Sequence, residues 1–284
     1  MREKGLHVER KFKNLIGEMP KLSLKDKIDF CPLSVLMPNR AEAQRLKEIC
    51  ADDGSTRQGV KIKTGFDASV GGDGSISIFN PDLAQKILAL YAPKNAEIID
   101  QFGGGGTRGI IAAMMGHKYT GIELRAEEVK RIEAQKKKLN LKFDIIVGDA
   151  KKWKPKKNKL FDFSFTCPPY YDLEIYSNDI DDISFNSSYG DFLSDMRLVL
   201  RNNYAMLKPG AFSVWVVGNF RNEEGYLRHF NGDLAQLAHG EGFRLWDELI
   251  WQGAAGIAAR RSGQFLANRK IVRIHEYILV FKKS

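Results

Sequence analysis

Hydrophobic and polar positions follow two different patterns along the chain, and the change comes near residue 80. After it, short apolar runs alternate with longer segments whose apolar residues recur at helical spacing, which predicts strands alternating with helices. The apolar runs predict strands over Glu97–Asp100, Tyr119–Glu123, Asp144–Val147, Phe161–Thr166, Phe212–Val217, Leu245–Trp251 and His275–Phe281. The longer segments predict helices over Asp82–Tyr91, Thr107–Met115, Ala126–Leu139, Asp191–Leu207 and Gly232–His239.

This alternation predicts an α/β, Rossmann-like fold with a seven-stranded, mostly parallel sheet and helices on both faces. The stretch between the last two strands, Gly253–Val272, is typical of a long loop, so we expect the final strand to be antiparallel. Residues 1–76 hold a Lys-rich opening, an amphipathic stretch and a Gly/Asp/Ser-rich segment. We therefore expect an N-terminal extension over 1–76, with target recognition or a lid as candidate roles, and a catalytic domain over 77–284.

The balance of charged residues indicates which class of molecule the protein binds. The 284 residues contain 44 Lys and Arg against 35 Asp and Glu, a net charge of +9. A basic surface favours a polyanion such as nucleic acid, because each neutralised phosphate releases counterions; a merely soluble basic protein is the alternative. Cys31, Cys50 and Cys167 form no CxxC pair and the five histidines show no ligand spacing, which predicts neither disulfide nor metal. Without a signal peptide or a long apolar run, we expect a cytoplasmic protein without membrane partners.

Three groups at successive predicted strand ends indicate a cofactor with an adenosine. The first strand runs into Gly103–Gly106, where missing side chains let the backbone approach a ligand. Glu123 ends the second strand, at the distance where an acid grips ribose hydroxyls, and an acid there disfavours NADP. Asp149 follows the third strand, where a carboxylate can accept from an adenine amino group.

The fourth strand ends in a second candidate motif, Thr166-Cys167-Pro168-Pro169-Tyr170. Two prolines fix φ and hold the turn rigid. The tyrosine offers a flat face on which a base taken out of its stack can rest.

With these motifs the sequence resembles the amino-methyltransferases of DNA. Their catalytic motif has Asp, Asn or Ser before Pro-Pro and an aromatic residue, and their cofactor motif, Asp-Pro-Phe-x-Gly-x-Gly, resembles Asp100–Thr107. The stretch Ser77–Asp82 is similar to the motif that precedes it, and His275–Lys282 to the family's last strand. The run from Thr166 to Asp179 is similar to methylases of bacteriophages and mobile elements. The resemblance covers about residues 77 to 282.

The resemblance implies a class I methyltransferase fold, S-adenosylmethionine as cofactor, and methylation of adenine N6 or cytosine N4 in flipped-out DNA bases, in a bacterial or phage-infected cytoplasm. The implied catalytic residues are Cys167, Pro168, Pro169 and Tyr170. The implied cofactor residues are Phe79, Asn80, Pro81, Asp100, Phe102, Gly103, Gly104, Gly106, Thr107, Glu123, Leu124, Asp149, Ala150 and Thr166. The oligomeric state stays open.

Cys167 is the departure from the family pattern. In the family this side chain accepts a hydrogen bond from the target amino group, and a thiol is a weak acceptor; the carbonyl of Pro168 supplies a second acceptor. Four alternatives stay open: an RNA guanine-N2 methyltransferase, pyrimidine C5 methylation with Cys167 as nucleophile, a catalytically silent DNA-binding relative, and an NAD-dependent oxidoreductase built on the glycine turn.

Two further segments are candidates for contact with the target. Asp172–Ser188 is too long for a simple turn and is interpreted as a flap over the base, with plain packing as the alternative. The predicted C-terminal loop carries cations that can contact phosphates or form a solvated face; these are Arg260, Arg261, Arg269, Lys270 and Arg273.

Overall fold

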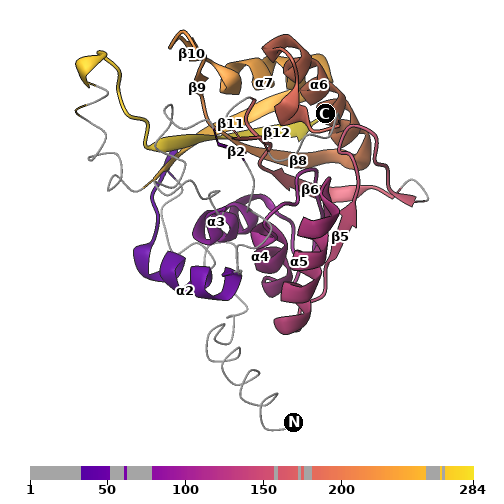
Figure 1. Ribbon diagram of the computed structural model, residues 1–284. Coiled ribbons are helices and arrows are strands. Elements are labelled where there is room, and N and C mark those ends of the chain that lie inside the picture. Colours follow the sequence, from indigo (N-terminus) through magenta and orange to yellow (C-terminus); the bar gives the residue numbers. More distant parts are fainter. Residues whose placement is uncertain are drawn as a thin grey trace. The chain divides into compact units, whose positions relative to one another are not determined.

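The computed structural model describes residues 33–51, 61–62, 79–156, 159–171, 174–175, 181–253, 263 and 266–284. Leu33–Ser284 form one compact unit, and its layers are visible in Figure 1. The unit therefore begins inside the segment that the sequence pattern assigned to an N-terminal extension. Cys31, Arg260 and Arg261 lie outside the described residues, as do residues 172–173 and 176–180 of the predicted flap.

The centre of the unit is an eight-stranded sheet. Its order is β1 (Val35–Leu36), β11 (Phe243–Gln252), β12 (His275–Lys283), β8 (Leu207–Val217), β6 (Phe161–Thr166), β3 (Glu97–Asp100), β4 (Lys118–Glu123) and β5 (Asp144–Val147). Strand β12 is antiparallel to both neighbours, and all other pairs are parallel. The mostly parallel sheet and its antiparallel last strand are confirmed; the predicted count of seven missed β1, because two residues carry no readable periodicity.

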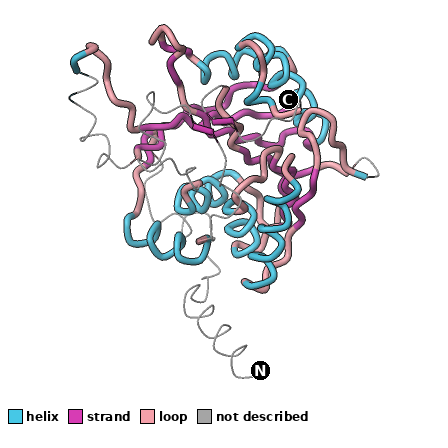
Figure 2. The backbone as a smooth tube through the Cα atoms, in the orientation of Figure 1, coloured by secondary structure: helices cyan, strands magenta, loops and turns pink. Residues whose placement is uncertain are grey.

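Helices cover both faces of this sheet, as Figures 1 and 2 show. On one face lie α3 (Pro81–Tyr91), α4 (Thr107–Met114) and α5 (Ala126–Lys138), with α2 (Arg40–Cys50) packed against α3. On the other face lie α6 (Tyr189–Met206) and α7 (Phe230–Gly240). This arrangement is the predicted Rossmann-like α/β fold.

Local sequence explains where α3 begins. Asn80 Oδ1 accepts hydrogen bonds from the backbone N–H groups of Asp82 (3.0 Å) and Leu83 (3.4 Å). Pro81 occupies the first helical position, where its missing N–H has no intrahelical partner in any case. This cap fixes the start of α3 next to Phe79, whose ring packs edge-on against Phe165 of β6 at 5.6 Å between centroids.

The core between the sheet and α6 and α7 is rich in aromatic side chains. Trp215, Phe192, Phe230, Phe243 and Phe281 are fully buried there. Each buried side chain of this size contributes roughly 1.5–3 kcal/mol relative to exposure. This packing makes the sheet a rigid platform whose parallel strands all end at one edge, which we call the carboxyl edge.

Three short elements lie outside the main sheet. Strand β2 (Lys61–Ile62) pairs antiparallel with β7 (Glu174–Ile175), which joins the N-terminal segment to the predicted flap through backbone hydrogen bonds. The flap region also contains the 3-10 helix η3 (Ile183–Phe185). Strands β9 (Phe220–Arg221) and β10 (Leu227–Arg228) form a hairpin that the sequence pattern did not predict.

Candidate active site at the carboxyl edge

The carboxylate of Asp100, at the end of β3, is fully buried and accepts four hydrogen bonds. Oδ2 accepts from Arg108 Nε and from the Tyr119 hydroxyl, each at 2.6 Å. Oδ1 accepts from the Thr166 hydroxyl at 2.7 Å and from the backbone N–H of Phe102 at 3.0 Å. Asp100 therefore ties together the end of β3, the end of β6 and the first turn of α4, and it orders the glycine loop through these bonds.

Arg108 extends this arrangement toward the segment before α3. Its guanidinium also donates to the carbonyl of Phe102, and its carbon Cζ lies 4.7 Å from the centre of the Phe79 ring. Burial acts to lower the pKa of Arg108, but the charge of Asp100, its hydrogen bond to Arg108 and the smaller contributions of Tyr119 and Cys167 together outweigh burial and raise the pKa. Sequence reasoning missed Arg108, which lies eight positions after Asp100, on the far side of the glycine loop and in the first turn of α4.

The glycines of the loop are required by close approach. A Cβ on Gly103 would lie 2.8 Å from Ile145 Cδ1, and one on Gly104 would lie 2.8 Å from Glu123 Oε2. Gly105 and Gly106 have φ of +72° and +73°, a left-handed conformation that side chains disfavour. The loop thus lies against β4 with the Glu123 carboxylate directly above it.

Glu123 is the buried acid of the site, with a side chain only 12% exposed. Its Oε1 accepts a hydrogen bond from the backbone N–H of Arg125 at 2.9 Å. Burial raises its pKa to about 7, and the nearby carboxylates of Glu128 and Asp182 act in the same direction, against the opposing effect of Arg125. Asp182 belongs to the predicted flap. Its charge acts on Glu123, so this flap residue contributes to the electrostatics of the predicted cofactor site.

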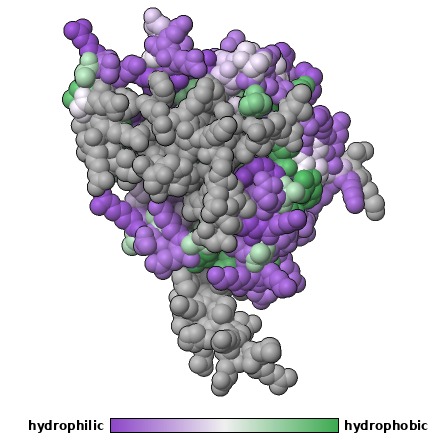
Figure 3. Space-filling model, in the orientation of Figure 1, coloured by the Kyte–Doolittle hydropathy of each residue, from purple (hydrophilic) through white to green (hydrophobic). Residues whose placement is uncertain are grey.

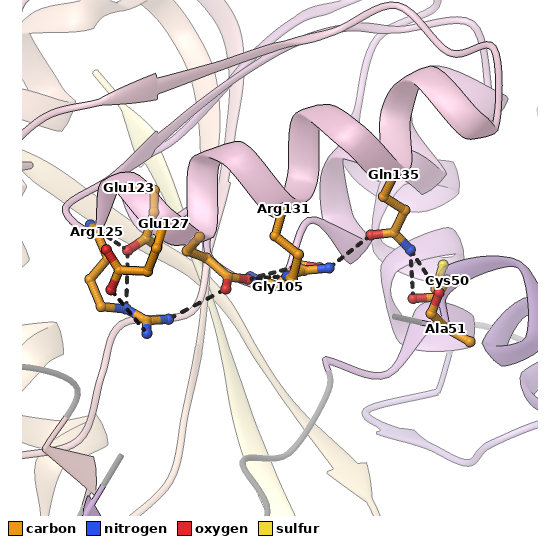
Figure 4. A network of polar contacts seen from close by, with 9 residues as sticks. Cys50, Ala51, Gly105, Glu123, Arg125, Glu127, Arg131 and Gln135 are labelled. Atoms are coloured by element: carbon orange, nitrogen blue, oxygen red, sulfur yellow. Dashed lines mark hydrogen bonds and ion pairs between the residues drawn. The ribbon is translucent and has the colours of Figure 1, made fainter. Parts of the chain in front are cut away.

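A polar network supports the loop from behind, as drawn in Figure 4. Arg131 on α5 donates to the Gly105 carbonyl at 3.0 Å and to Glu128 Oε1 at 2.6 Å, while Glu128 Oε1 accepts from the Gly105 N–H at 3.1 Å. Arg131 also donates to Gln135, whose amide nitrogen reaches the carbonyls of Cys50 (2.9 Å) and Ala51 at the end of α2. The glycine loop is thereby connected to the N-terminal helix, a connection that no sequence motif signals.

Asp149 and Ala150 lie after β5, as predicted, and bind neighbouring protein groups. Asp149 Oδ1 accepts from the Lys151 N–H at 2.8 Å, and Oδ2 pairs with Lys152 Nζ at 3.2 Å. The carbonyl of Ala150 accepts from Asn202 at 3.1 Å. This turn adjoins Glu123, because the Gly148 N–H donates to the Glu123 carbonyl at 2.9 Å.

The predicted catalytic motif begins at Thr166, the last residue of β6. Cys167 and Tyr170 are half-buried, and Pro168 is buried. The Tyr170 ring packs against Phe220 at 6.2 Å between centroids, and its hydroxyl donates to Glu276 Oε1 at 3.3 Å. The Pro-Pro-Tyr turn begins after Thr166 and the glycine loop begins after Asp100, and these two residues are hydrogen-bonded to each other. The structure therefore brings the two predicted motifs together.

The residues of the candidate cofactor site fit S-adenosylmethionine on two counts. Gln101 Nε2 and Thr107 Oγ1, at the two ends of the glycine loop, are buried without a hydrogen-bond partner in the described part of the chain. Gly104 keeps the space beneath the Glu123 carboxylate free of a side chain. Of the remaining predicted residues, Leu124 is half-buried after Glu123, and Phe102 packs edge-on against Trp215.

Within the described ranges no group of three or more His, Cys, Asp or Glu side chains could hold a metal ion. The same ranges contain no helix with the length and apolar character needed to cross a membrane. Of the predicted phosphate-contacting cations, Arg269, Lys270 and Arg273 are described, and Arg273 donates to the Asn219 carbonyl at 3.1 Å.

This chain resembles known proteins in two respects, in the sequence of its C-terminal part and in its fold. Residues 161–284 match the DNA methylase family. Among solved structures, TrmN from Thermus thermophilus is 17% identical, with a TM-score of 0.50, over 73% of this chain and 50% of that one. A methyltransferase from Pyrococcus furiosus is 13% identical, with a TM-score of 0.49, over 72% and 83%. A SAM-dependent methyltransferase from Methanosarcina mazei is 17% identical, with a TM-score of 0.48, over 69% and 96%. No curated protein matches the sequence.

The fold shared with TrmN agrees with the predicted fold, and the family match agrees with the predicted cofactor. This chain spans half the length of TrmN, and the family match lies in its C-terminal part, which contains the Pro-Pro-Tyr motif. The matched family uses S-adenosylmethionine as methyl donor. The chain therefore has the Rossmann-like fold of S-adenosylmethionine-dependent methyltransferases, and its residues 161–284 carry the signature of the N6-adenine and N4-cytosine DNA methylases.

Proposed function

We propose that the protein transfers a methyl group from S-adenosylmethionine to an exocyclic amino group, adenine N6 or cytosine N4, of a base in DNA. The observation that carries the proposal is the 2.7 Å hydrogen bond between Thr166 and Asp100. It joins the first residue of the catalytic motif to the first residue of the cofactor loop, so donor and acceptor share one edge of the sheet. The net charge of +9 suits a polyanionic substrate.

On the donor side, the chain holds the cofactor through fixed polar groups. The Glu123 carboxylate above Gly104 would accept hydrogen bonds from ribose hydroxyls, and Asp149 would accept from the adenine amino group. Gln101 and Thr107 supply buried polar atoms at the two ends of the loop. When bound, S-adenosylmethionine supplies an electrophilic methyl group, whose bond to sulfur breaks as its bond to the amino nitrogen forms.

On the acceptor side, the chain orients the base. The Tyr170 ring would stack on the flipped base, since it is fixed by Phe220 and Glu276. The Pro168 carbonyl would accept a hydrogen bond from the amino group and Cys167 a weaker one, which keeps the nitrogen lone pair directed at the methyl carbon. The surplus amino proton leaves to water after transfer, so no residue is required as a general base.

The decisive experiment is incorporation of label from the methyl-labelled cofactor. Purified protein is incubated separately with mixed-sequence duplex DNA and with total RNA, and each product is digested to nucleosides and identified by mass spectrometry. N6-methyl-2′-deoxyadenosine or N4-methyl-2′-deoxycytidine in the digest of the DNA is the expected result. Label confined to RNA guanine would establish the RNA alternative, and 5-methylcytosine would establish Cys167 as nucleophile; either result overturns the proposal.

A control variant separates activity from copurified enzymes. Lys138→Ala changes an exposed side chain at the end of α5, whereas Asp100→Asn removes the charge that pairs with Arg108. We expect label with the former and none with the latter. Cys167→Ser addresses the silent-relative alternative: a wild-type protein without activity and an active Ser variant would show that the cysteine had abolished catalysis.

A further inference from the structure

The hairpin formed by β9 and β10 carries exposed apolar side chains on a well-ordered turn. Tyr226 is 71% exposed and Leu227 is 45% exposed, on a molecule whose described surface is mainly hydrophilic in the view of Figure 3. The Asn222 N–H donates to the Tyr226 carbonyl at 2.9 Å, and the Tyr226 N–H donates to Asn222 Oδ1 at 2.7 Å. Arg221 closes the turn by donating to the Gly225 carbonyl at 2.8 Å. The exposed tyrosine is therefore held in place by the backbone of its turn.

The base of this hairpin is built on the acceptor side of the active site. Phe220 packs against the ring of Tyr170. Arg228 lies over the rings of Tyr171 and Tyr189, with Cζ 4.9 and 4.6 Å from their centres. The turn that presents Tyr226 is consequently connected, through rigid aromatic contacts, to the tyrosine proposed to receive the base.

The charges around the hairpin indicate what it faces. Lys270 lies so close to Gly225 that a Cβ there would come within 2.5 Å of its ammonium group, and Arg273 bonds to the Asn219 carbonyl at the hairpin base. These cations suit phosphates. The turn itself carries Glu223 and Glu224, which phosphates would repel but which can accept from base amino groups in a groove. The distribution fits a turn that faces the bases, with Lys270 beside the turn and Arg273 at the hairpin base available to the backbone phosphates.

We infer that the hairpin Phe220–Arg228 enters duplex DNA beside the target base, and that Tyr226 stacks in the space opened when that base leaves the helix. This inference rests on the proposed function, because the hairpin is the element that would open the duplex for methylation of the base. An aromatic ring can replace the lost stacking whatever the neighbouring sequence, since every base has a π-face. Lys270 beside the turn and Arg273 at the hairpin base then contact the phosphates and fix the depth of entry.

The test compares two DNA substrates that differ only in the free energy needed to move the target base out of the duplex. One is a synthetic duplex with the methylated site found by the labelling experiment; the other has an abasic position opposite the target base, which is then already unpaired. Tyr226→Ala is expected to lower kcat/KM about tenfold on the paired duplex and at most about twofold on the second one. Tyr226→Phe should retain wild-type values on both, because it keeps the ring.

Controls distinguish the failure of each idea. Trp246→Ala removes another exposed aromatic side chain, 58% exposed on β11 and packed against Phe212, and should leave both rates unchanged. Cofactor affinity and melting temperature of Tyr226→Ala should equal those of the wild type. An equal loss on both substrates, or no loss on the paired duplex, overturns the hairpin inference while leaving methylation intact. A wild-type enzyme that labels no DNA overturns the proposed function itself.

Discussion

The donor and acceptor sides of the active site are built in different ways. The donor side consists of backbone and charged groups that bind one another: Asp100 accepts four hydrogen bonds, and Gly105 is bonded through both its N–H and its carbonyl. The acceptor side consists of rings in contact, with Tyr170 against Phe220 and Tyr171 against Tyr189. One side fixes polar groups in advance, and the other presents flat surfaces.

This difference matches two kinds of ligand. A cofactor of constant structure is bound best by preorganised hydrogen-bonding groups whose geometry needs no adjustment. A base that arrives from a duplex needs a face to stack on and few direction-dependent bonds. Substitutions on the two sides should therefore separate cleanly: donor-side changes act on cofactor affinity, and acceptor-side changes act on turnover.

The largest expected effect is that of Tyr170→Ala on turnover. Loss of a stacking ring costs about 1–3 kcal/mol and misorients the amino group, so we expect kcat to fall about 100-fold. Calorimetric titration should show that the Kd for S-adenosylhomocysteine stays within about twofold of the wild-type value. Tyr170→Phe, which loses only the 3.3 Å contact with Glu276, should keep most activity. A collapse of cofactor affinity would place Tyr170 on the donor side and break the comparison.

Gly104→Ala should have the next largest effect, on cofactor affinity. The new Cβ would lie 2.8 Å from Glu123 Oε2, so the carboxylate must move away from the loop. Losing hydrogen bonds to a charged group costs about 1.5–3 kcal/mol, which corresponds to a Kd at least about tenfold higher. Gly190→Ala is the matched control, because the nearest atom to its added Cβ is Ser188 Oγ at 3.6 Å. Equal Kd values for the two variants would contradict the assigned role of the loop.

Much of the donor side could be predicted because it is local in sequence. Asp100 and Glu123 each end a strand that the hydrophobic pattern delimits, and the glycine run follows directly after Asp100. Strands β3, β5 and β6 have the predicted bounds. The antiparallel β12 followed from the absence of a crossover helix. What sequence missed is long-range: Gln135 contacts Cys50 across 85 positions, and no periodicity encodes such a partner.

The acceptor side was predicted less completely for a physical reason. Its motif was readable because two prolines restrict the backbone, but the hairpin carrying Phe220 and Arg228 was not. Its strands are two residues long, too short for an alternation to register. The stacking of Arg228 on Tyr171 likewise joins residues far apart in the chain and depends on packing alone.

A smaller effect is expected from pH, again on the donor side alone. Glu123 has a pKa of about 7, and its ionised form accepts ribose hydroxyls better. Cofactor affinity should therefore rise several-fold between about pH 6 and pH 8, and Glu123→Gln should abolish this rise. Glu97→Gln, at the opposite end of β3 and paired with Lys159, should preserve it. A wild-type Kd that does not change with pH would show that Glu123 does not bind the ribose.

Stability should change with the opposite sign. The folded protein retains a proton on Glu123 that the unfolded chain loses near the ordinary pKa of 4.5. Between this pH and about 7, the contribution of Glu123 to stability therefore falls as pH rises. Urea unfolding should show Glu123→Gln gaining stability relative to the wild type across this window, and no relative gain would contradict the raised pKa.

The smallest effect on cofactor affinity is expected from Gln135→Ala, which shows how far the donor side extends. The variant loses bonds to the Cys50 and Ala51 carbonyls and to Arg131, which then holds Gly105 less firmly. We expect an unfolding free energy lower by about 1–3 kcal/mol and a cofactor Kd about threefold higher, with kcat at saturating cofactor unchanged. Lys138→Ala, exposed on the same helix, is the control. A lower kcat with an unchanged cofactor Kd would contradict this assignment. It would mean that the contact between α2 and Gln135 affects the position of the base and not that of the glycine loop.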